Sequence, residues 1–283
     1  MTVNRWIVAG LAAAVLASTA PGFAQAQVRY VKYEAGGRAF WGILENNDTI
    51  IRELQGNPFD GSAKPTGKTV KPVEVKYLPP AEAKKVIAAG FNYRSHIGQA
   101  SPAKYVGLFA KFPTSLTGHE QPIIYPADAT TVHYEAEICV VIGKKATNIT
   151  EAQAKDYIFG VTACNDVSER AWQKQDLQWL RAKAADTFGP MGPVLVTSVD
   201  YANLKLIGRH NGKVVQETTT DLLIFSIDNI VSYTSRYITL EPGDVIFTGT
   251  PGTTQSMKPG DTFEVEIPGV TTLKNTVVAA KPQ

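Results

Sequence analysis

The stretch Tyr134 to Gly143, YEAEICVVIG, decides how this sequence folds. Residues 138–142 form a continuous apolar run rich in β-branched side chains, which predicts a strand buried on both faces. Glu135 and Glu137 stand two residues apart at its start. Because side chains alternate along a strand, both carboxylates point to one face, about 7 Å apart. Two acids on one face repel each other unless water or a cation screens their charges.

This acidic pair has two competing interpretations. A solvated strand end with outward charges is the ordinary one, and the pair taken alone favours it because most acidic side chains are exposed. The other is a site for a hard, oxygen-seeking cation. Asp166 follows a second apolar run, residues 158–163, and either caps the helix predicted after it or supplies a third carboxylate. Three carboxylates suit Mg²⁺, with water or substrate completing the octahedron.

Outward from this stretch, short runs of strand type dominate the chain. The predicted strands lie at residues 28–33, 39–44, 49–51, 86–90, 138–142, 158–163, 194–196, 204–207, 245–247 and 263–267. Residues 150–155 and 167–184 predict helices, the second opening with Asp166 and Glu169 at capping-box spacing. The polar stretch 55–71, rich in Gly, Pro and Lys, predicts a loop. Irregular strand spacing with few helices predicts a strand-dominated α+β fold rather than a doubly wound sheet.

The first residues predict a secretory signal peptide, residues 1–26. Arg5 is followed by an apolar run of about 12 residues, too short to span a bilayer, and then by Ala24-Gln25-Ala26, a pattern typical of signal cleavage. The alternatives are an uncleaved anchor or a misassigned start. We therefore expect a protein secreted across the inner membrane into the periplasm, with no membrane contact after cleavage.

Size and charge limit the partners. Cleavage would leave 257 residues (283 minus 26), enough for one large core with a small appendage. It would also remove Arg5, so the formal charge falls from +2 to +1. A balance so close to neutral argues against a nucleic-acid partner, which needs a clustered basic surface.

Several further motifs follow one another along the chain. They are GFNY (90–93) with His96, KFPTSLTG (111–118), YEAEICVVIG (134–143), NDVSERAWQ (165–173), KAADTFGPMGP (183–193) and LEPGDVIFTGTPG (240–252). Singly they are weak, since a lone histidine is usually structural and the last motif is by itself a plain turn. In this order they resemble the fumarylacetoacetate hydrolase family over nearly all of the mature chain. The resemblance implies a small N-terminal β-domain at 27–80 and a metal-binding catalytic domain of mixed β-roll type at 81–283.

The resemblance also implies roles for particular residues. Glu135, Glu137 and Asp166 would bind a divalent cation, Mg²⁺ or Mn²⁺, which reverses the preference for a solvated pair. The implied catalytic residues are His96, Lys183 and Thr250, and the implied substrate-binding residues are Arg170 and Gln173. A small oxo-acid substrate and a homodimer are expected on the same basis.

The implied activity is hydrolysis of C–C bonds in small β-diketo or 2-oxo acids. The cation would polarise the carbonyl of the bound acid and stabilise an enolate. His96 would activate water, and Lys183 or Thr250 would stabilise the oxyanion. The same enolate serves an isomerase or a decarboxylase of 2-oxo or 2-hydroxydienoic dicarboxylic acids. A periplasmic protein that binds oxo-acids without turnover is a third hypothesis.

One departure from the family pattern bears on this choice. Many members carry Glu three residues after the histidine, where this chain has Gln99. A neutral amide neither orients His96 as a carboxylate would nor raises its basicity. This puts hydrolysis most in doubt and favours the isomerase or decarboxylase alternative.

Of the only two cysteines, Cys139 lies in the first apolar run and Cys164 directly follows the second, beside the acidic residues. If these strands are antiparallel neighbours with Glu137 opposite Asp166, Cys139 faces Cys164. We hypothesise that an oxidising periplasm then joins them in a disulfide beside the metal. The alternative is a pair of small buried hydrophobic residues.

Overall fold

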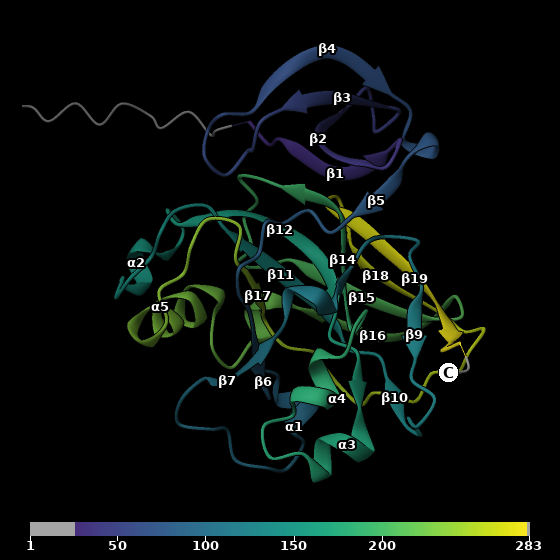
Figure 1. Cartoon of the computed structure of the whole chain (residues 1–283). Helices are drawn as coiled ribbons and strands as arrows, with labels where there is room; N and C mark the ends of the chain where they lie inside the picture. Colours follow the sequence, from purple (N-terminus) through teal and green to yellow (C-terminus); the bar gives the residue numbers. More distant parts are fainter. Residues whose placement is uncertain (1–25, 282–283) are drawn as a thin grey trace, which may run out of the picture.

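The computed structural model describes residues 26–281, and its strands far outweigh its helices (Figure 1). The N-terminal strands are β1 (Arg29–Ala35), β2 (Arg38–Glu45), β3 (Ile50–Gln55), β4 (Lys64–Val70) and β5 (Lys76–Leu78). The later strands are β6 (Val86–Gly90), β7 (Gly107–Lys111), β8 (Leu116–Thr117), β9 (Ile123–Tyr125), β10 (Val132–His133), β11 (Ala136–Ile142), β12 (Ile158–Asn165), β13 (Ser168–Glu169), β14 (Gly189–Val196), β15 (Lys205–His210), β16 (Lys213–Thr219), β17 (Val245–Phe247), β18 (Thr262–Ile267) and β19 (Thr271–Ala279). The helices are α1 (Arg94–Ile97), α2 (Glu151–Ala154), α3 (Arg170–Gln175), α4 (Leu180–Ala184) and α5 (Ile227–Tyr237), with short 3-10 turns at Pro72–Glu74, Pro113–Ser115 and Thr220–Leu222.

Most strands belong to two sheets. Within residues 26–281, the larger has the order β4-β3-β2-β1-β14-β12-β11-β17-β6-β7, and the smaller has the order β16-β15-β18-β19-β9. Both contain antiparallel and parallel pairs, such as antiparallel β11–β12 and parallel β17–β6. The fold is therefore strand-dominated and mixed, as the sequence predicted. Figure 1 shows β1–β4 at one end of the molecule and α1, α3 and α4 at the other.

Strand β11 is buried on both faces, which explains its continuous apolar run. Ile138 and Val140 belong to a core that also contains Val265 of the smaller sheet and Ile230 of α5. Cys139, Val141 and Trp41 of β2 belong to a second cluster on the opposite face. Every residue of β11 is buried, so the end of this strand is a rigid place for functional side chains.

Three sequence predictions about elements are wrong. Residues 55–71 are not all loop, because β4 pairs with β3; β4 is an exposed edge strand, so no buried alternation marks it. The helix predicted over 167–184 is divided into β13, α3 and α4, with Trp179 at φ +57° between the helices. Asp166 is not a cap: the side chain of Glu169 caps α3 by accepting from the backbone N–H of Trp172. Helix α5 was not predicted.

The cysteine hypothesis is confirmed in its outcome but not in its register. Strands β11 and β12 are antiparallel neighbours, yet Glu137 lies opposite Cys164 rather than opposite Asp166. Cys139 and Cys164 are diagonal neighbours with Cα atoms 5.9 Å apart, and they form a disulfide. By strand alternation the disulfide lies on the same face as the acidic side chains.

Among the described helices, none has the length and apolar composition needed to cross a membrane.

Candidate active site

Three carboxylates meet where β11 begins and β12 ends. Glu135, Glu137 and Asp166 each offer an oxygen within 4.8 Å of the others, and all three are buried. The backbone fixes this meeting, because Asp166 N donates to Glu135 O over 2.9 Å. A buried cluster of carboxylate oxygens suits a hard divalent cation such as Mg²⁺ or Mn²⁺, so these residues fit the predicted metal site.

Two buried lysines pair with this triad. Lys183 on α4 donates to Glu135 Oε2 over 2.7 Å and to Asp166 Oδ2 over 2.6 Å. Lys111, at the end of β7, donates to Asp166 Oδ1 over 2.7 Å, to Phe188 O over 3.1 Å and to Lys183 O. Lys111 belongs to one of the sequence motifs but was not predicted to have a role, because lysine is rarely buried.

The charges in the cluster shift the pKa values in opposite directions. Burial raises the pKa of Glu137 well above its usual value, and the neighbouring carboxylates Asp166 and Glu135 add to the rise. Burial would also raise the pKa of Glu135, but Lys183 and Arg170 outweigh it and hold the pKa below its usual value. Burial works against charged Lys183, yet the two acids outweigh it and raise its pKa. Glu137 is therefore the least compensated of the three acids.

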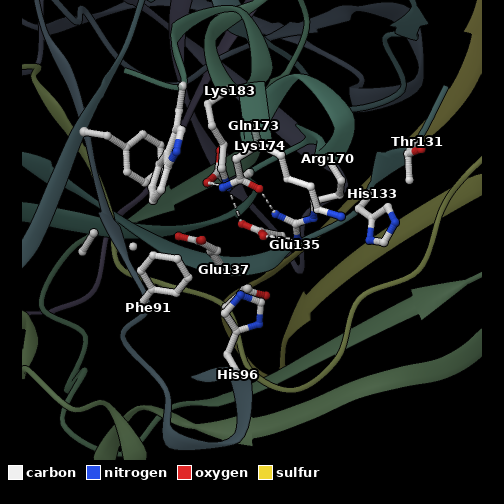
Figure 2. Close-up of a pocket in the computed structure, with 16 residues that line it drawn as sticks. Phe91, His96, Thr131, His133, Glu135, Glu137, Arg170, Gln173, Lys174 and Lys183 are labelled. Carbon is white, nitrogen blue, oxygen red and sulfur yellow. Dashed lines mark hydrogen bonds and ion pairs between the residues drawn. The ribbon is translucent and has the colours of Figure 1, made fainter. Parts of the chain in front are cut away.

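Arg170 and Gln173, predicted to bind substrate, lie together on α3. Arg170 Nη1 donates to Gln173 Oε1 over 2.8 Å, and Arg170 Nη2 pairs with Glu135 and donates to Thr254 Oγ1 over 2.8 Å. Figure 2 shows this group beside the acidic residues. The arginine is thus tied to both the triad and the loop that follows β17.

His96 lies on α1, across the cavity from Glu135 and Glu137 (Figure 2). Its Nδ1 is 2.6 Å from the carbonyl oxygen of Gly252. A carbonyl only accepts, so Nδ1 carries the hydrogen, and in the neutral ring Nε2 keeps a free lone pair. Gln99 is exposed. Within residues 26–281, His96 has no hydrogen-bonded carboxylate, as expected from Gln99, and the Gly252 carbonyl orients the ring instead.

Thr250 is held by a residue that the sequence did not single out. Gln216 on β16 donates through Nε2 to Thr250 Oγ1 over 2.8 Å and to Pro251 O over 2.6 Å. Its Oε1 accepts from the backbone N–H of Ala136 over 2.9 Å. Gln216 thus connects the glycine-rich turn to the strand of the acidic pair. Only the buried position of this glutamine in a hairpin would have indicated it, and burial is not visible in sequence.

A cavity of about 490 Å³ brings every predicted site residue together. These residues are His96, Glu135, Glu137, Asp166, Arg170, Gln173, Lys183 and Thr250. Three aromatic side chains, Phe91, Phe109 and Trp179, form an apolar wall that sequence analysis missed. The volume suits a small organic ligand. His133 also lines the cavity, and burial, followed by the charge of Arg170, lowers its pKa to about 4.

Comparison with known families identifies the class of protein. Residues 85–278 match the family described as fumarylacetoacetate (FAA) hydrolase C-terminal, and residues 28–80 match the one described as Rv2993c-like, N-terminal. The first match covers more than half of the chain. The protein therefore belongs to the fumarylacetoacetate hydrolase family, as its motifs indicated.

Individual relatives differ in the activity that they are named for. A solved structure of 5-carboxymethyl-2-hydroxymuconate delta-isomerase from Mycobacterium smegmatis is 38% identical, with TM-score 0.83, and the match covers 89% of this chain and 100% of that one. The mitochondrial oxaloacetate tautomerase fahd2 of Xenopus laevis is 40% identical over 71% of this chain and 67% of its own. A 4-hydroxyphenylacetate degradation bifunctional isomerase/decarboxylase of Salmonella dublin is 41% identical over 68% of this chain and 46% of its own.

The relatives correct the predicted location. The oxaloacetate tautomerases of Xenopus laevis, rat and human are mitochondrial by name, which contradicts secretion into the periplasm as the setting for proteins of this kind. The predicted signal peptide, residues 1–26, lies outside the described residues except for Ala26.

Proposed function

We propose that this protein is a divalent-cation-dependent isomerase that moves a proton next to the carbonyl of a small 2-oxo or 2-hydroxydienoic dicarboxylic acid. The observation that carries the proposal is the hydrogen bond from His96 Nδ1 to Gly252 O, which leaves Nε2 unprotonated in the neutral ring. Such a nitrogen, facing a buried acidic cluster across a small cavity, is placed to accept a proton and return it.

The acidic residues supply the site for the cation. Glu135, Glu137 and Asp166 would hold Mg²⁺ or Mn²⁺. When bound, the cation would polarise the carbonyl of a 2-oxo acid and stabilise negative charge on its oxygen. Decarboxylation of the same class of acid needs the same stabilisation, so it is the natural companion activity.

The other side chains have roles in orientation and charge. The Thr250 hydroxyl accepts from Gln216, so its own hydrogen remains available to an oxygen of the substrate. Lys183 holds Glu135 and Asp166 in place and adds positive charge close to them. Phe91, Phe109 and Trp179 give one side of the cavity an apolar surface.

Hydrolysis of C–C bonds, which the sequence first favoured, is less well supported. It needs a base strong enough to activate water. His96 pairs with a neutral carbonyl rather than with a carboxylate that would raise its basicity. The names of the relatives described above also agree better with isomerase, tautomerase or decarboxylase chemistry.

The test is turnover by the purified protein with Mg²⁺ or Mn²⁺, using EDTA as the control. Oxaloacetate and 2-hydroxyhepta-2,4-diene-1,7-dioate would be followed by ultraviolet absorbance, and proton exchange next to the carbonyl by NMR in D₂O. We expect cation-dependent isomerisation and deuterium uptake. Cation-dependent cleavage of an acylpyruvate without exchange in the two dicarboxylic acids would replace the isomerase by the hydrolase.

A further inference from the structure

We propose that His133 determines the specificity of this site, by donating a hydrogen bond from Nε2 to a second carboxylate of the substrate, remote from the acidic triad. This inference rests on the proposed function, because it assumes that a 2-oxo acid binds at the triad. It adds a residue that the motifs did not indicate and a reason for a dicarboxylic substrate.

The backbone of His133 is fixed on both sides. It pairs with Ser168 in the β10–β13 ladder and forms a β-bridge to Ser256. The side chain lines the cavity. Figure 2 shows His133 beyond Arg170, away from Glu137 and His96. A rigid backbone and a fixed ring make this position suitable for recognition.

A chain of hydrogen bonds determines which ring nitrogen carries the hydrogen. Arg170 Nη2 donates to Thr254 Oγ1 over 2.8 Å, and Thr254 Oγ1 is 2.9 Å from His133 Nδ1. These are the two partners of the Thr254 hydroxyl oxygen within residues 26–281. Arginine cannot accept, so of these two partners only His133 Nδ1 can take the threonine hydrogen. The neutral ring then carries its hydrogen on Nε2.

Nε2 is open to a ligand. Within the described residues it makes no hydrogen bond. The buried side-chain atoms without a partner are Thr162 Oγ1 and Thr234 Oγ1, so Nε2 is not one of them. Nε2 is therefore exposed, on a side chain that lines the cavity. Arg170 adds further donors, because its Nη2 is occupied while its Nε–H and one Nη1–H have no partner in residues 26–281. Two neighbouring groups that donate and do not accept favour a carboxylate over a hydroxyl or an amide.

The charges of the cavity support the same ligand. The triad carries three negative charges when ionised, and Lys111, Lys183 and Arg170 carry three positive charges when protonated. A divalent cation would leave this cluster with an excess of two positive charges. Exposed Lys174 adds another positive charge to the lining of the cavity. A dianionic acid therefore matches the site better than a monoanionic one.

The experiment uses two ligands that differ only at the far end. 2-Oxoglutarate and 2-oxopentanoate share the 2-oxo acid group and the chain length, and the second has a methyl group in place of the remote carboxylate. Calorimetry with the Mg²⁺-loaded protein would measure both affinities in wild type, His133→Leu, His133→Gln and His119→Leu. His119 is a matched control, because it is another half-buried imidazole and does not line the cavity.

We expect wild type to prefer 2-oxoglutarate and His133→Leu to reduce that preference at least about tenfold, the effect expected when a hydrogen bond to a charged group is lost. His133→Gln should restore part of the preference through its amide N–H, and His119→Leu should leave it unchanged. Affinity for 2-oxopentanoate should stay constant in all four proteins. Equal weakening of both ligands, or an unchanged preference in His133→Leu, would overturn the inference.

A second measurement requires no ligand. Long-range ¹H–¹⁵N NMR of histidine-labelled protein distinguishes the two neutral tautomers, with His133→Gln identifying the signal. Hydrogen on Nε2 of His133 is expected, and hydrogen on Nδ1 alone would refute the argument. These tests also distinguish a failure of the proposed isomerase activity from a failure of the proposed role of His133. Discrimination between the two ligands without turnover of any oxo-acid would contradict the proposed isomerase and leave the role of His133 intact.

Discussion

His96 depends on a single carbonyl for its orientation, and this determines what its removal should do. We expect His96→Gln to lower kcat by a factor of about 100 or more, the usual contribution of a positioned base, while Mg²⁺ affinity stays unchanged. Turnover and metal titration on the same preparation would check both. Gln99→Glu serves as the control: Gln99 is exposed, and His96 Nδ1 already donates to Gly252. A large gain in acylpyruvate hydrolysis in this variant would show that the missing carboxylate matters after all.

Lys111 is the site residue whose environment could least be predicted from the sequence. Its ammonium group is fully buried and donates to a proposed metal ligand and to two backbone carbonyls. We expect Lys111→Met to weaken Mn²⁺ binding about tenfold or more, because partners that orient a metal ligand typically contribute that much. Electron paramagnetic resonance of Mn²⁺ would measure it. Lys85→Met is the matched control, since Lys85 pairs with buried Asp244 outside the cavity. Equal weakening in both variants would point to general destabilisation.

These two residues also show where sequence analysis succeeds and where it stops. His96 could be predicted because its motif stands in a fixed order with the others. The Gly252 carbonyl that orients it lies 156 positions away, and no pattern of residue types indicates that contact. The motifs contain Lys111, but neither its burial nor its pairing with Asp166 follows from residue type, because lysine is usually exposed.

At the scale of elements, α3 depends on its cap. Glu169 is fully buried and accepts from Trp172 N over 2.5 Å, Thr131 N over 2.7 Å and Thr130 N over 3.1 Å. Burial opposes ionisation of Glu169, but these donors outweigh it and lower its pKa. The cap therefore also joins α3, which carries Arg170, to the loop before β10.

Removing this cap should lower the stability of the folded protein. We expect Glu169→Ala to lower the free energy of unfolding by about 2 to 4 kcal/mol, because several buried N–H groups lose their acceptor. Denaturant titration would measure this loss. Since the folded pKa is depressed, the advantage of wild type over Glu169→Gln should be complete above the ordinary value of 4.5 and should disappear as pH falls through the folded pKa. A difference that persists in stronger acid would mean that the carboxylate charge is not the cause.

The bridge between β11 and β12 is a second prediction at this scale. Cys139 and Cys164 enclose 25 positions of chain, and a loop of that size corresponds to about 3.5 kcal/mol in the chain-entropy view. We expect alkylation under denaturing conditions to label no thiol before reduction and two after it. Cys139→Ala with Cys164→Ala should unfold at lower denaturant than oxidised wild type and match reduced wild type. Two thiols labelled without reductant would show that the residues are simply buried.

At the scale of the whole molecule, the pairing of strands that lie far apart in the sequence could not be predicted. The strand-dominated class and the strands beside the acidic pair followed from short apolar runs. The sheet order did not, because β1 pairs with β14, and β6 pairs with β17, across most of the chain. Edge strand β4 and the break between α3 and α4 were missed for a related reason. Their conformation depends on the neighbours that they contact rather than on their own residue pattern.

Cation binding should stabilise the whole molecule, because Glu135, Glu137 and Asp166 come together only in the folded chain. We expect Mg²⁺ or Mn²⁺ to raise the unfolding temperature in a concentration-dependent manner, by an amount equivalent to about 2.7 kcal/mol at a hundred times Kd, and EDTA to reverse it. Differential scanning calorimetry would follow both steps. Glu137→Gln should lose most of this gain. Glu53→Gln, which changes a buried acid outside the cavity, should start from a lower temperature and keep the full gain. An unfolding temperature independent of either cation, or an undiminished gain in Glu137→Gln, would remove the triad as the metal site.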